Sequence, residues 1–319
     1  NAGIFESAKA YSDTAVVVLA RSGGEGADLP TSLDPDAEDT FQDGGTFGSS
    51  GLRYSDQKDD LDASKSYLEL SNREKAMLDR VTADYDNVVL VVNAANTMQL
   101  DFVEDYSQIK SVVWCPGTGQ SGFNALGKIL SGEVNPSAKT SDTFVRDLTK
   151  TPTYNNFGNF SYDNMDEFAV DGVNPTFVNY TDGIYVGYRF YETAATEGLI
   201  NYDELVQYPF GYGLSYTTFE QKMGDLQVND GQISVDVTIT NTGDVAGKDV
   251  AEVYYNPPYT NGGIEKASAN LVGFAKTQML NPGESETVTV SFSAEDMASY
   301  DYQNAKAYVL EAGEYKISL

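Results

Sequence analysis

A short apolar run followed by a glycine-rich loop decides how this sequence is interpreted. The run is Ala15-Val16-Val17-Val18-Leu19-Ala20, and the loop is Arg21-Ser22-Gly23-Gly24-Glu25-Gly26-Ala27-Asp28. A β-branched apolar run of this length is typical of a buried strand in a parallel sheet. Open α/β sheets bind their ligands beyond the carboxyl ends of such strands. We therefore expect the glycines to hold the Glu25 carboxylate out toward a cleft, although a solvated acidic residue in a glycine-rich loop is also a common structural feature.

Alternating helices and strands are predicted after this loop. Residues 29–66 are polar and rich in Asp, Gly and Ser, which predicts a long loop that either walls the cleft or is disordered. Ser71 is predicted to cap a helix that reaches about Tyr85, with Glu74 at its third position. This alternation indicates an α/β sandwich domain with a mostly parallel sheet. The remaining predicted elements of this domain are a first short helix at 1–14, strands at 88–92 and 111–115, and helices at 100–106 and 119–130.

The last third of the chain has a different pattern. Residues 233–239, 252–255 and 287–292 alternate apolar and polar side chains with a period of two, and turn-forming residues separate them. Short strands at this spacing predict an all-β sandwich. We assign residues 1–216 to the α/β domain, with an irregular aromatic segment at 144–182, and residues 217–319 to the β-sandwich.

The composition excludes several classes of function. The chain has 48 acidic and 20 basic residues and a net charge of −28, which disfavours nucleic acids and anionic membranes as partners. It contains no histidine, so Ser-His-Asp and Cys-His triads and most zinc sites are excluded, and acid–base chemistry falls to carboxylates. We expect no metal site, no cofactor and no membrane span. Cys115 is interpreted as a buried structural thiol.

Five motifs give the chain a resemblance to a known family. They are Gly24-Glu25-Gly26-Ala27-Asp28, Asn135-Pro136-Ser137-Ala138-Lys139, Asp182-Gly183-Ile184-Tyr185-Val186-Gly187-Tyr188-Arg189, Pro209-Phe210-Gly211-Tyr212-Gly213-Leu214-Ser215-Tyr216, and a tail with Ile264-Glu265-Lys266 and Leu271-Val272-Gly273-Phe274. In this order and spacing they resemble the second and third domains of glycoside hydrolase family 3, the β-glucosidase family, of which the third is fibronectin type III-like. Tyr212 stands where the family usually has a histidine. The family's (β/α)8 barrel is not found in these residues.

The resemblance implies a function that is divided between domains. Retaining glycosidases use two carboxyl groups about 5–5.5 Å apart, one as nucleophile and one as general acid/base. In this family the barrel supplies an aspartate nucleophile, and the resemblance implies that Glu25 is the acid/base. The alternative is Glu38 or a carboxylate elsewhere in the 30–66 loop. Gly24, Gly26, Asp28 and Arg21 are expected to support the loop, and Arg21 is expected to form a structural ion pair with Asp28 or with the barrel.

The chain is thus predicted to be a portion of a retaining β-glycosidase, of the β-glucosidase type, that removes terminal non-reducing β-D-glucosyl residues. Asn1 is not an initiator methionine, which fits a piece of a longer protein, and the chain alone is expected to be inactive. The expected partners are a barrel that precedes or follows the chain, a β-glucoside or oligosaccharide, and a second copy in a possible homodimer. The alternative function is a non-catalytic carbohydrate-binding or scaffold module. The sequence leaves three questions open: whether the substrate is a glucoside or a xyloside, whether the protein is secreted or cytoplasmic, and whether the aromatic run 184–191 is a core strand or a sugar subsite.

Overall fold

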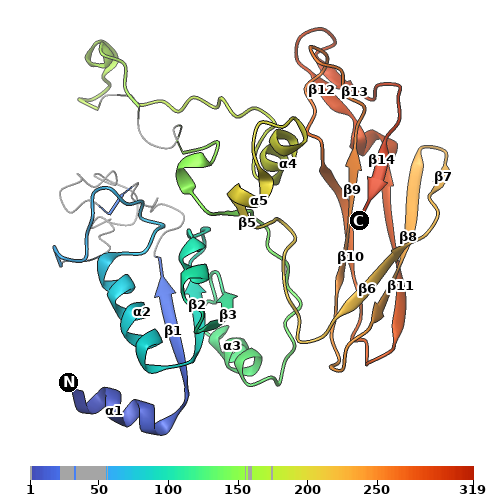
Figure 1. Ribbon diagram of the computed structural model, residues 1–319. Coiled ribbons are helices and arrows are strands. Elements are labelled where there is room, and N and C mark those ends of the chain that lie inside the picture. The colour runs from blue at the N-terminus through green and yellow to red at the C-terminus, as the bar shows by residue number, and fades with distance from the viewer. Residues whose placement is uncertain are drawn as a thin grey trace. The chain divides into compact units, whose positions relative to one another are not determined.

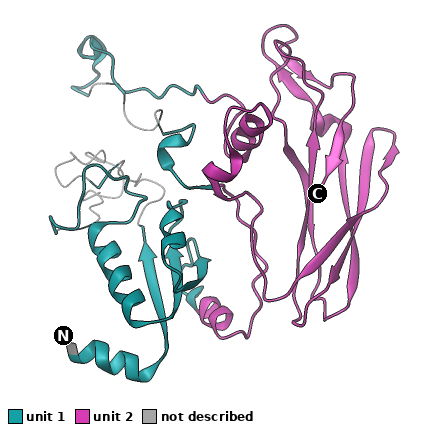
Figure 2. Ribbon diagram, in the orientation of Figure 1, with its two compact units in different colours: residues 1–123, 144–181 teal, residues 124–143, 182–319 magenta. Residues whose placement is uncertain are grey.

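The chain forms two compact units that do not follow its order in sequence (Figure 2). The computed structural model describes residues 2–21, 32–33, 55, 57–154, 156, 160–173 and 175–319. Unit 1 comprises residues 1–123 and 144–181, and unit 2 comprises residues 124–143 and 182–319. The two units divide the chain at other positions than the predicted domain boundary between residues 216 and 217, since the segment just before that boundary belongs to unit 2. The boundary stays a prediction.

Unit 1 contains a three-stranded parallel sheet in the order β1-β2-β3 (Figure 1). Its strands are β1 (Thr14–Ala20), β2 (Asn87–Asn93) and β3 (Ile109–Trp114), and its helices are α1 (Ala2–Tyr11) and α2 (Asn72–Asp84). The central strand β2 is the most deeply buried, since Val88, Leu90, Val91 and Val92 are fully enclosed. The valine-rich runs thus form the parallel strands that the sequence predicts.

Helix α2 begins and ends where its sequence signals indicate. The Ser71 hydroxyl accepts a hydrogen bond from the backbone N–H of Glu74 at 3.2 Å, and the Glu74 carboxylate accepts one from the backbone N–H of Ser71 at 3.0 Å. This reciprocal capping box satisfies two backbone donors that the first helical turn leaves open. The helix turns Glu74, Leu78 and Thr82 inward at intervals of four residues and contacts β1 and β2.

Strand β1 differs from the expected fully buried strand. Val17 and Leu19 belong to the core, but Val16 and Val18 are 54% and 52% exposed. Alternate residues of a strand point to opposite faces, and in the described part of the chain only one face of β1 is covered. The apolar run therefore predicted the strand correctly, but only one of the strand's two faces is buried as expected.

The rest of unit 1 is largely irregular, as predicted for residues 144–182. Its short elements are the 3₁₀ helices η1 (Asp101–Asp105), η2 (Leu148–Lys150) and η3 (Met165–Phe168) and the strand β4 (Phe144–Val145). Aromatic side chains pack on one another within it, and the Tyr162 and Phe177 rings stack with centroids 4.4 Å apart.

Unit 2 contains the predicted β-sandwich. One sheet has the order β10-β9-β14 and the other β11-β8-β6, with β7 paired to β8. The strands are β6 (Phe219–Met223), β7 (Gln227–Asn229), β8 (Gln232–Asn241), β9 (Val250–Asn256), β10 (Asn270–Lys276), β11 (Ser285–Ser293) and β14 (Lys316–Ser318), with β12 (Ser299–Asp301) and β13 (Ala307–Val309) in a separate hairpin. Alternate residues of β8, β9 and β11 form the core, for example Val235, Val253 and Val290. The period-two pattern thus predicted both the strands and their buried faces.

Two predictions for the segments that precede the sandwich were wrong in part. Unit 2 also contains α3 (Phe123–Leu130), α4 (Tyr188–Thr196), α5 (Tyr202–Leu205), the 3₁₀ helix η4 (Ala294–Met297) and the short strand β5 (Val206–Tyr208). Helix α3 starts four residues later than predicted, because Gly117 and Gly119 adopt positive φ angles that a right-handed helix excludes. The core strand that was one interpretation of the aromatic run 184–191 does not form, because Gly187 has a positive φ angle and α4 begins at Tyr188.

Candidate functional site

Arg21 lies at the start of the predicted acid/base loop, directly after β1, and its side chain is buried. Its backbone N–H continues the sheet by donating to the carbonyl of Asn93 at 3.1 Å. Its guanidinium donates to the carbonyls of Ala20, Tyr67 and Glu69 and to both carboxylate oxygens of Glu74, at 2.7 and 2.8 Å. All five N–H groups of an arginine side chain can be used by such a set of acceptors.

The Arg21–Glu74 ion pair joins the end of β1 to the beginning of α2. The side chains of Arg21 and Glu74 are 1% and 9% exposed, so both charges are removed from water. Such a pair persists only with good geometry and additional hydrogen bonds, and here the bidentate contact and the capping box at Ser71 provide them. The ion pair fixes the residue from which the loop starts.

Asp60 holds the segment before α2 at the same place. Its carboxylate accepts a hydrogen bond from the backbone N–H of Arg73 at 2.9 Å, and its carbonyl accepts one from the backbone N–H of Asn72. Burial acts to raise the pKa of Asp60, but hydrogen bonds from the Ser71 hydroxyl and the Arg73 N–H outweigh it and hold the pKa below its ordinary value of 3.8. The ionised form of Asp60 is therefore favoured in the folded protein.

The other predicted site residues lie outside the described part of the chain. These are Glu25, Gly24, Gly26, Asp28 and the alternative Glu38. Their roles, and a pairing of Arg21 with Asp28, stay predictions. The sequence predicted Glu74 only as the third residue of the capping box and not as the partner of Arg21.

In unit 2 the motifs at 135–139 and 209–216 form one connected set of contacts. The side-chain oxygen of Asn135 accepts hydrogen bonds from the Ser215 hydroxyl at 2.9 Å and from the Tyr216 N–H at 2.8 Å, and its amide nitrogen donates to the carbonyl of Ala246. The Lys139 ammonium lies 3.2 Å from an Asp249 carboxylate oxygen and donates to the carbonyl of Gly213. These motifs tie the segment before α4 to the sandwich.

Two glycines of the fourth motif, at 209–216, lie where an added Cβ would meet neighbouring atoms. A Cβ on Gly213 would lie 2.2 Å from the carbonyl oxygen of Ala138, and one on Gly211 would lie 2.2 Å from the Glu252 carboxylate. Gly211 also has a φ of +77°, which favours glycine. The intervening Tyr212, in the position usually held by histidine in the resembling family, places its ring 5.1 Å from that of Tyr208.

The aromatic motif before and within α4 packs inside unit 2. The Tyr188 ring lies 4.6 Å from that of Phe210 and 6.0 Å from that of Tyr254, and its hydroxyl accepts a hydrogen bond from the Leu271 N–H. Tyr191 is buried. These contacts show that this run packs against other residues of unit 2.

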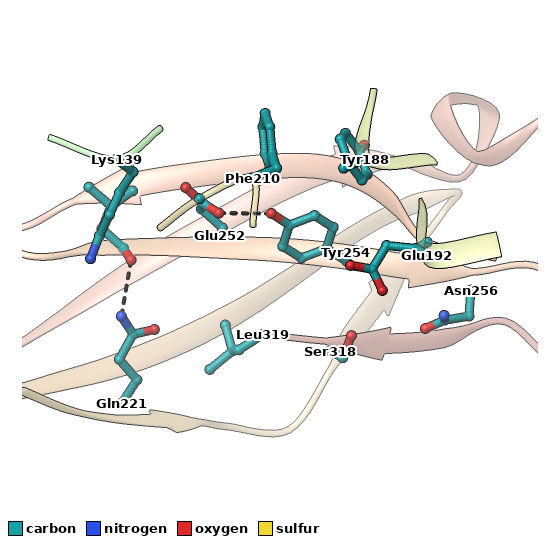
Figure 3. Close-up of a pocket in the computed structure, with 13 residues that line it drawn as sticks. Lys139, Tyr188, Glu192, Phe210, Gln221, Glu252, Tyr254, Asn256, Ser318 and Leu319 are labelled. Carbon is teal, nitrogen blue, oxygen red and sulfur yellow. Dashed lines mark hydrogen bonds between the residues drawn. The ribbon is translucent and has the colours of Figure 1, made fainter. Parts of the chain in front are cut away.

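A pocket of about 490 Å³ lies on the outer face of β9 (Figure 3). Its floor is formed by Glu252, Tyr254 and Asn256, which alternate along β9 with the buried residues of the sandwich core. The Tyr254 hydroxyl donates to Glu252 at 2.8 Å. Burial and this hydrogen bond raise the pKa of Tyr254, so it stays protonated. This pocket could not be predicted from the sequence, because its residues come from segments more than 100 positions apart.

Cys115 is half-buried just after β3, and burial raises the pKa of its thiol. It is therefore less enclosed than the buried thiol that the sequence predicts. Across the described ranges, three or more Cys, Asp or Glu side chains nowhere converge as a metal site would need. Of the helices that the structure describes, none is long and apolar enough to cross a membrane.

Comparison with known proteins identifies both parts of the chain. Residues 4–188 match the glycosyl hydrolase family 3 C-terminal domain, and residues 249–319 match the fibronectin type III-like domain. Beta-glucosidase A of Butyrivibrio fibrisolvens is 34% identical over 340 residues, which cover 99% of this chain and 36% of that protein. A beta-glucosidase of Ruminococcus albus is 34% identical over 83% of this chain and 26% of its own length.

Solved structures give the same result. A beta-glucosidase from Paenibacillus barengoltzii superposes with a TM-score of 0.74 at 31% identity, covering 99% of this chain and 30% of that one. Beta-glucosidase 3B from Thermotoga neapolitana, in complex with α-D-glucose, has a TM-score of 0.71 at 30% identity and covers 99% of this chain and 37% of that one. The chain thus spans between about a quarter and somewhat over a third of the length of these relatives.

Proposed function

Because the chain belongs to glycoside hydrolase family 3, we propose that it is part of a retaining β-glucosidase and supplies the general acid/base of that enzyme. The family membership extends over the α/β part and the fibronectin type III-like part of the chain. The relatives that match 99% of the chain are called β-glucosidases, and they are about three times its length. The remaining length leaves room for a barrel domain that carries the nucleophile.

The proposed chemistry divides two carboxyl groups between two domains. An aspartate of the barrel attacks the anomeric carbon, and Glu25 protonates the departing glycosidic oxygen and then removes a proton from the water that hydrolyses the glycosyl-enzyme. Glu25 must be protonated when the substrate binds. Partial burial and the charge of the nearby nucleophile would raise its pKa for this role.

The anchoring of Arg21 is the observation that best supports this assignment. A loop that must deliver one carboxyl group to within about an ångström of its working position needs a fixed starting point. The buried Arg21–Glu74 pair provides one four residues before Glu25. Specificity for glucosides is proposed from the names of the relatives, and a homodimer stays a prediction.

The test uses the whole protein with Glu25→Gln and, as the matched control, Glu38→Gln. Loss of the acid should lower kcat by about 10²–10⁴-fold for glucosides with poor leaving groups. Activated aryl glucosides, which need no protonation of the leaving group, should lose far less in their glycosylation step. Glu38→Gln should leave both substrates nearly unaffected.

Equal losses for both substrates in Glu25→Gln would contradict the assignment. The reverse pattern, with the selective loss in Glu38→Gln, would move the acid/base to the alternative residue. Full activity in both variants would leave the non-catalytic carbohydrate-binding or scaffold module as the better description of this part of the chain.

A further inference from the structure

The pocket on the outer face of β9 has the chemistry of a small-molecule site. Its floor residues Glu252, Tyr254 and Asn256 point away from the sandwich core, and its walls include Tyr188 and Glu192 of α4 (Figure 3). Its volume of about 490 Å³ lies within the range of about 300–1,000 Å³ found for ligand pockets. Several polar groups therefore converge on a space large enough for one or two sugar rings.

The polar groups of the pocket are mainly hydrogen-bond acceptors. The amide nitrogen of Gln221 donates to Asp249 at 2.8 Å and to the carbonyl of Val250 at 3.0 Å, and that of Asn256 donates to the carbonyl of Ser268. Both amides thus use N–H groups within the protein, and their oxygens can only accept. The carboxylates of Glu252 and Glu192 are acceptors as well. A ligand for this pocket should therefore carry several donors.

Charge narrows the class of ligand further. Two carboxylates in the lining disfavour an anion, and the Lys139 ammonium in the same lining is paired with Asp249. The carboxylates are already engaged, because Glu252 accepts from Tyr254 and Glu192 accepts from the Tyr202 hydroxyl. An uncharged ligand with many hydroxyl groups fits this arrangement best.

The pocket also offers apolar surface. The rings of Tyr188, Phe210 and Tyr254 lie together at its edge, with centroids 4.6 and 6.0 Å apart. Aromatic rings bury apolar groups, and the tyrosine hydroxyl adds a polar end. The C–H faces of a pyranose ring beside its hydroxyl groups match a wall that is apolar in one part and acceptor-rich in another.

We propose that this pocket binds an uncharged mono- or disaccharide. This binding site goes beyond the acid/base function proposed for Glu25, and it belongs to unit 2, whereas Glu25 belongs to unit 1. It would give the protein a second place at which a sugar can be held.

The test is calorimetric titration of D-glucose and of cellobiose into the 319-residue chain. We expect saturable binding of at least one sugar. Glu252→Gln and Asn256→Ala should each weaken it roughly tenfold or more, because each removes an acceptor from the pocket. The matched control is Glu220→Gln, an exposed position on β6 that does not line the pocket. Circular dichroism checks that each variant is folded.

Either absence of saturable binding for both sugars, or equal binding by Glu252→Gln, Asn256→Ala and Glu220→Gln, would overturn the proposal. Tighter binding of choline than of sugars would also overturn it by showing a site for organic cations. A chain with Glu25→Gln should bind sugar like the unmodified chain. The two proposals are thus tested separately. The titration measures sugar binding to the pocket, whereas the acid/base assignment is tested by turnover in the whole protein.

Discussion

Glu74→Gln should destabilise unit 1 strongly, because it breaks the buried ion pair with Arg21 while it keeps the shape of the side chain. One oxygen of the new amide can still accept from Arg21. The amide nitrogen replaces the oxygen that now accepts from both the Arg21 guanidinium and the Ser71 N–H. Removing one partner of a buried pair leaves an uncompensated charge and typically costs about 3–5 kcal/mol.

An exposed pair in the same unit provides the control. Arg73 and Asp59 form an ion pair with side chains 51% and 71% exposed. Exposed pairs contribute about 0–1 kcal/mol, so Asp59→Asn should change the free energy of unfolding by less than about 1 kcal/mol. A folded domain has a total stability of about 5–15 kcal/mol, so the loss at Glu74 is a large fraction of it.

Urea unfolding followed by tryptophan fluorescence measures this difference in unit 1 alone. The chain has a single tryptophan, Trp114, which lies at the end of β3 and donates from its indole N–H to the carbonyl of Ala94 at 2.8 Å. If Glu74→Gln and Asp59→Asn shift the transition equally, the reasoning about the buried pair is wrong. Should Glu74→Gln not fold, Arg21→Lys replaces it. That variant keeps the charge but loses the forked hydrogen bonds, and it should still cost more than Asp59→Asn.

Three further changes test the structure by thermal and pH-dependent unfolding. Gly213→Ala should destabilise unit 2 more than Gly127→Ala, since a Cβ on Gly213 would lie 2.2 Å from the backbone carbonyl oxygen of Ala138, whereas one on Gly127 would meet nothing within 4 Å. Equal melting temperatures would contradict the close approach. The pKa of Asp60 is lowered, so its contribution to the free energy of unfolding is present above its ordinary pKa of 3.8 and is lost as pH falls through the folded-state pKa. Asp60→Asn should therefore make the stability fall less steeply with decreasing pH in this range. An unchanged acid limb would count against the cited hydrogen bonds. Burial raises the pKa of Tyr191 from 10.0 to about 12, so the folded state loses stability relative to the unfolded state as pH rises across that interval. Tyr191→Phe, which cannot ionise, should therefore unfold at a higher pH than the unmodified chain. A lower pH midpoint of alkaline unfolding in this variant would refute the prediction.

The elements that could be predicted from the sequence are those with local signals. The capping box at Ser71 predicted the start of α2, and alternation along β8 predicted which side chains enter the sandwich core. The family resemblance was confirmed in both parts of the chain. The first two predictions depend on residues a few positions apart, and the resemblance depends on motifs that are each contiguous in the sequence.

The features that were missed depend on contacts between distant residues. The partner of Arg21 lies 53 positions away at Glu74, and the sequence gives no signal that selects it over other carboxylates. The aromatic run before Tyr188 has a period of two, but the positive φ angles of Gly183 and Gly187 convert it into turns and a helix. Glu25 lies outside the described residues, so its role stays a prediction from the motif.

One measurement tests the central claim most directly. It identifies the product that the whole protein with Glu25→Gln forms from an activated aryl β-glucoside in the presence of azide. Without its base the variant should accumulate the glycosyl-enzyme, and azide, which needs no base, should attack it. We predict faster turnover with azide and β-glucosyl azide as the product identified by NMR. A variant that hydrolyses poor substrates at the unmodified rate, or one that forms no β-glucosyl azide, would show that Glu25 is not the acid/base.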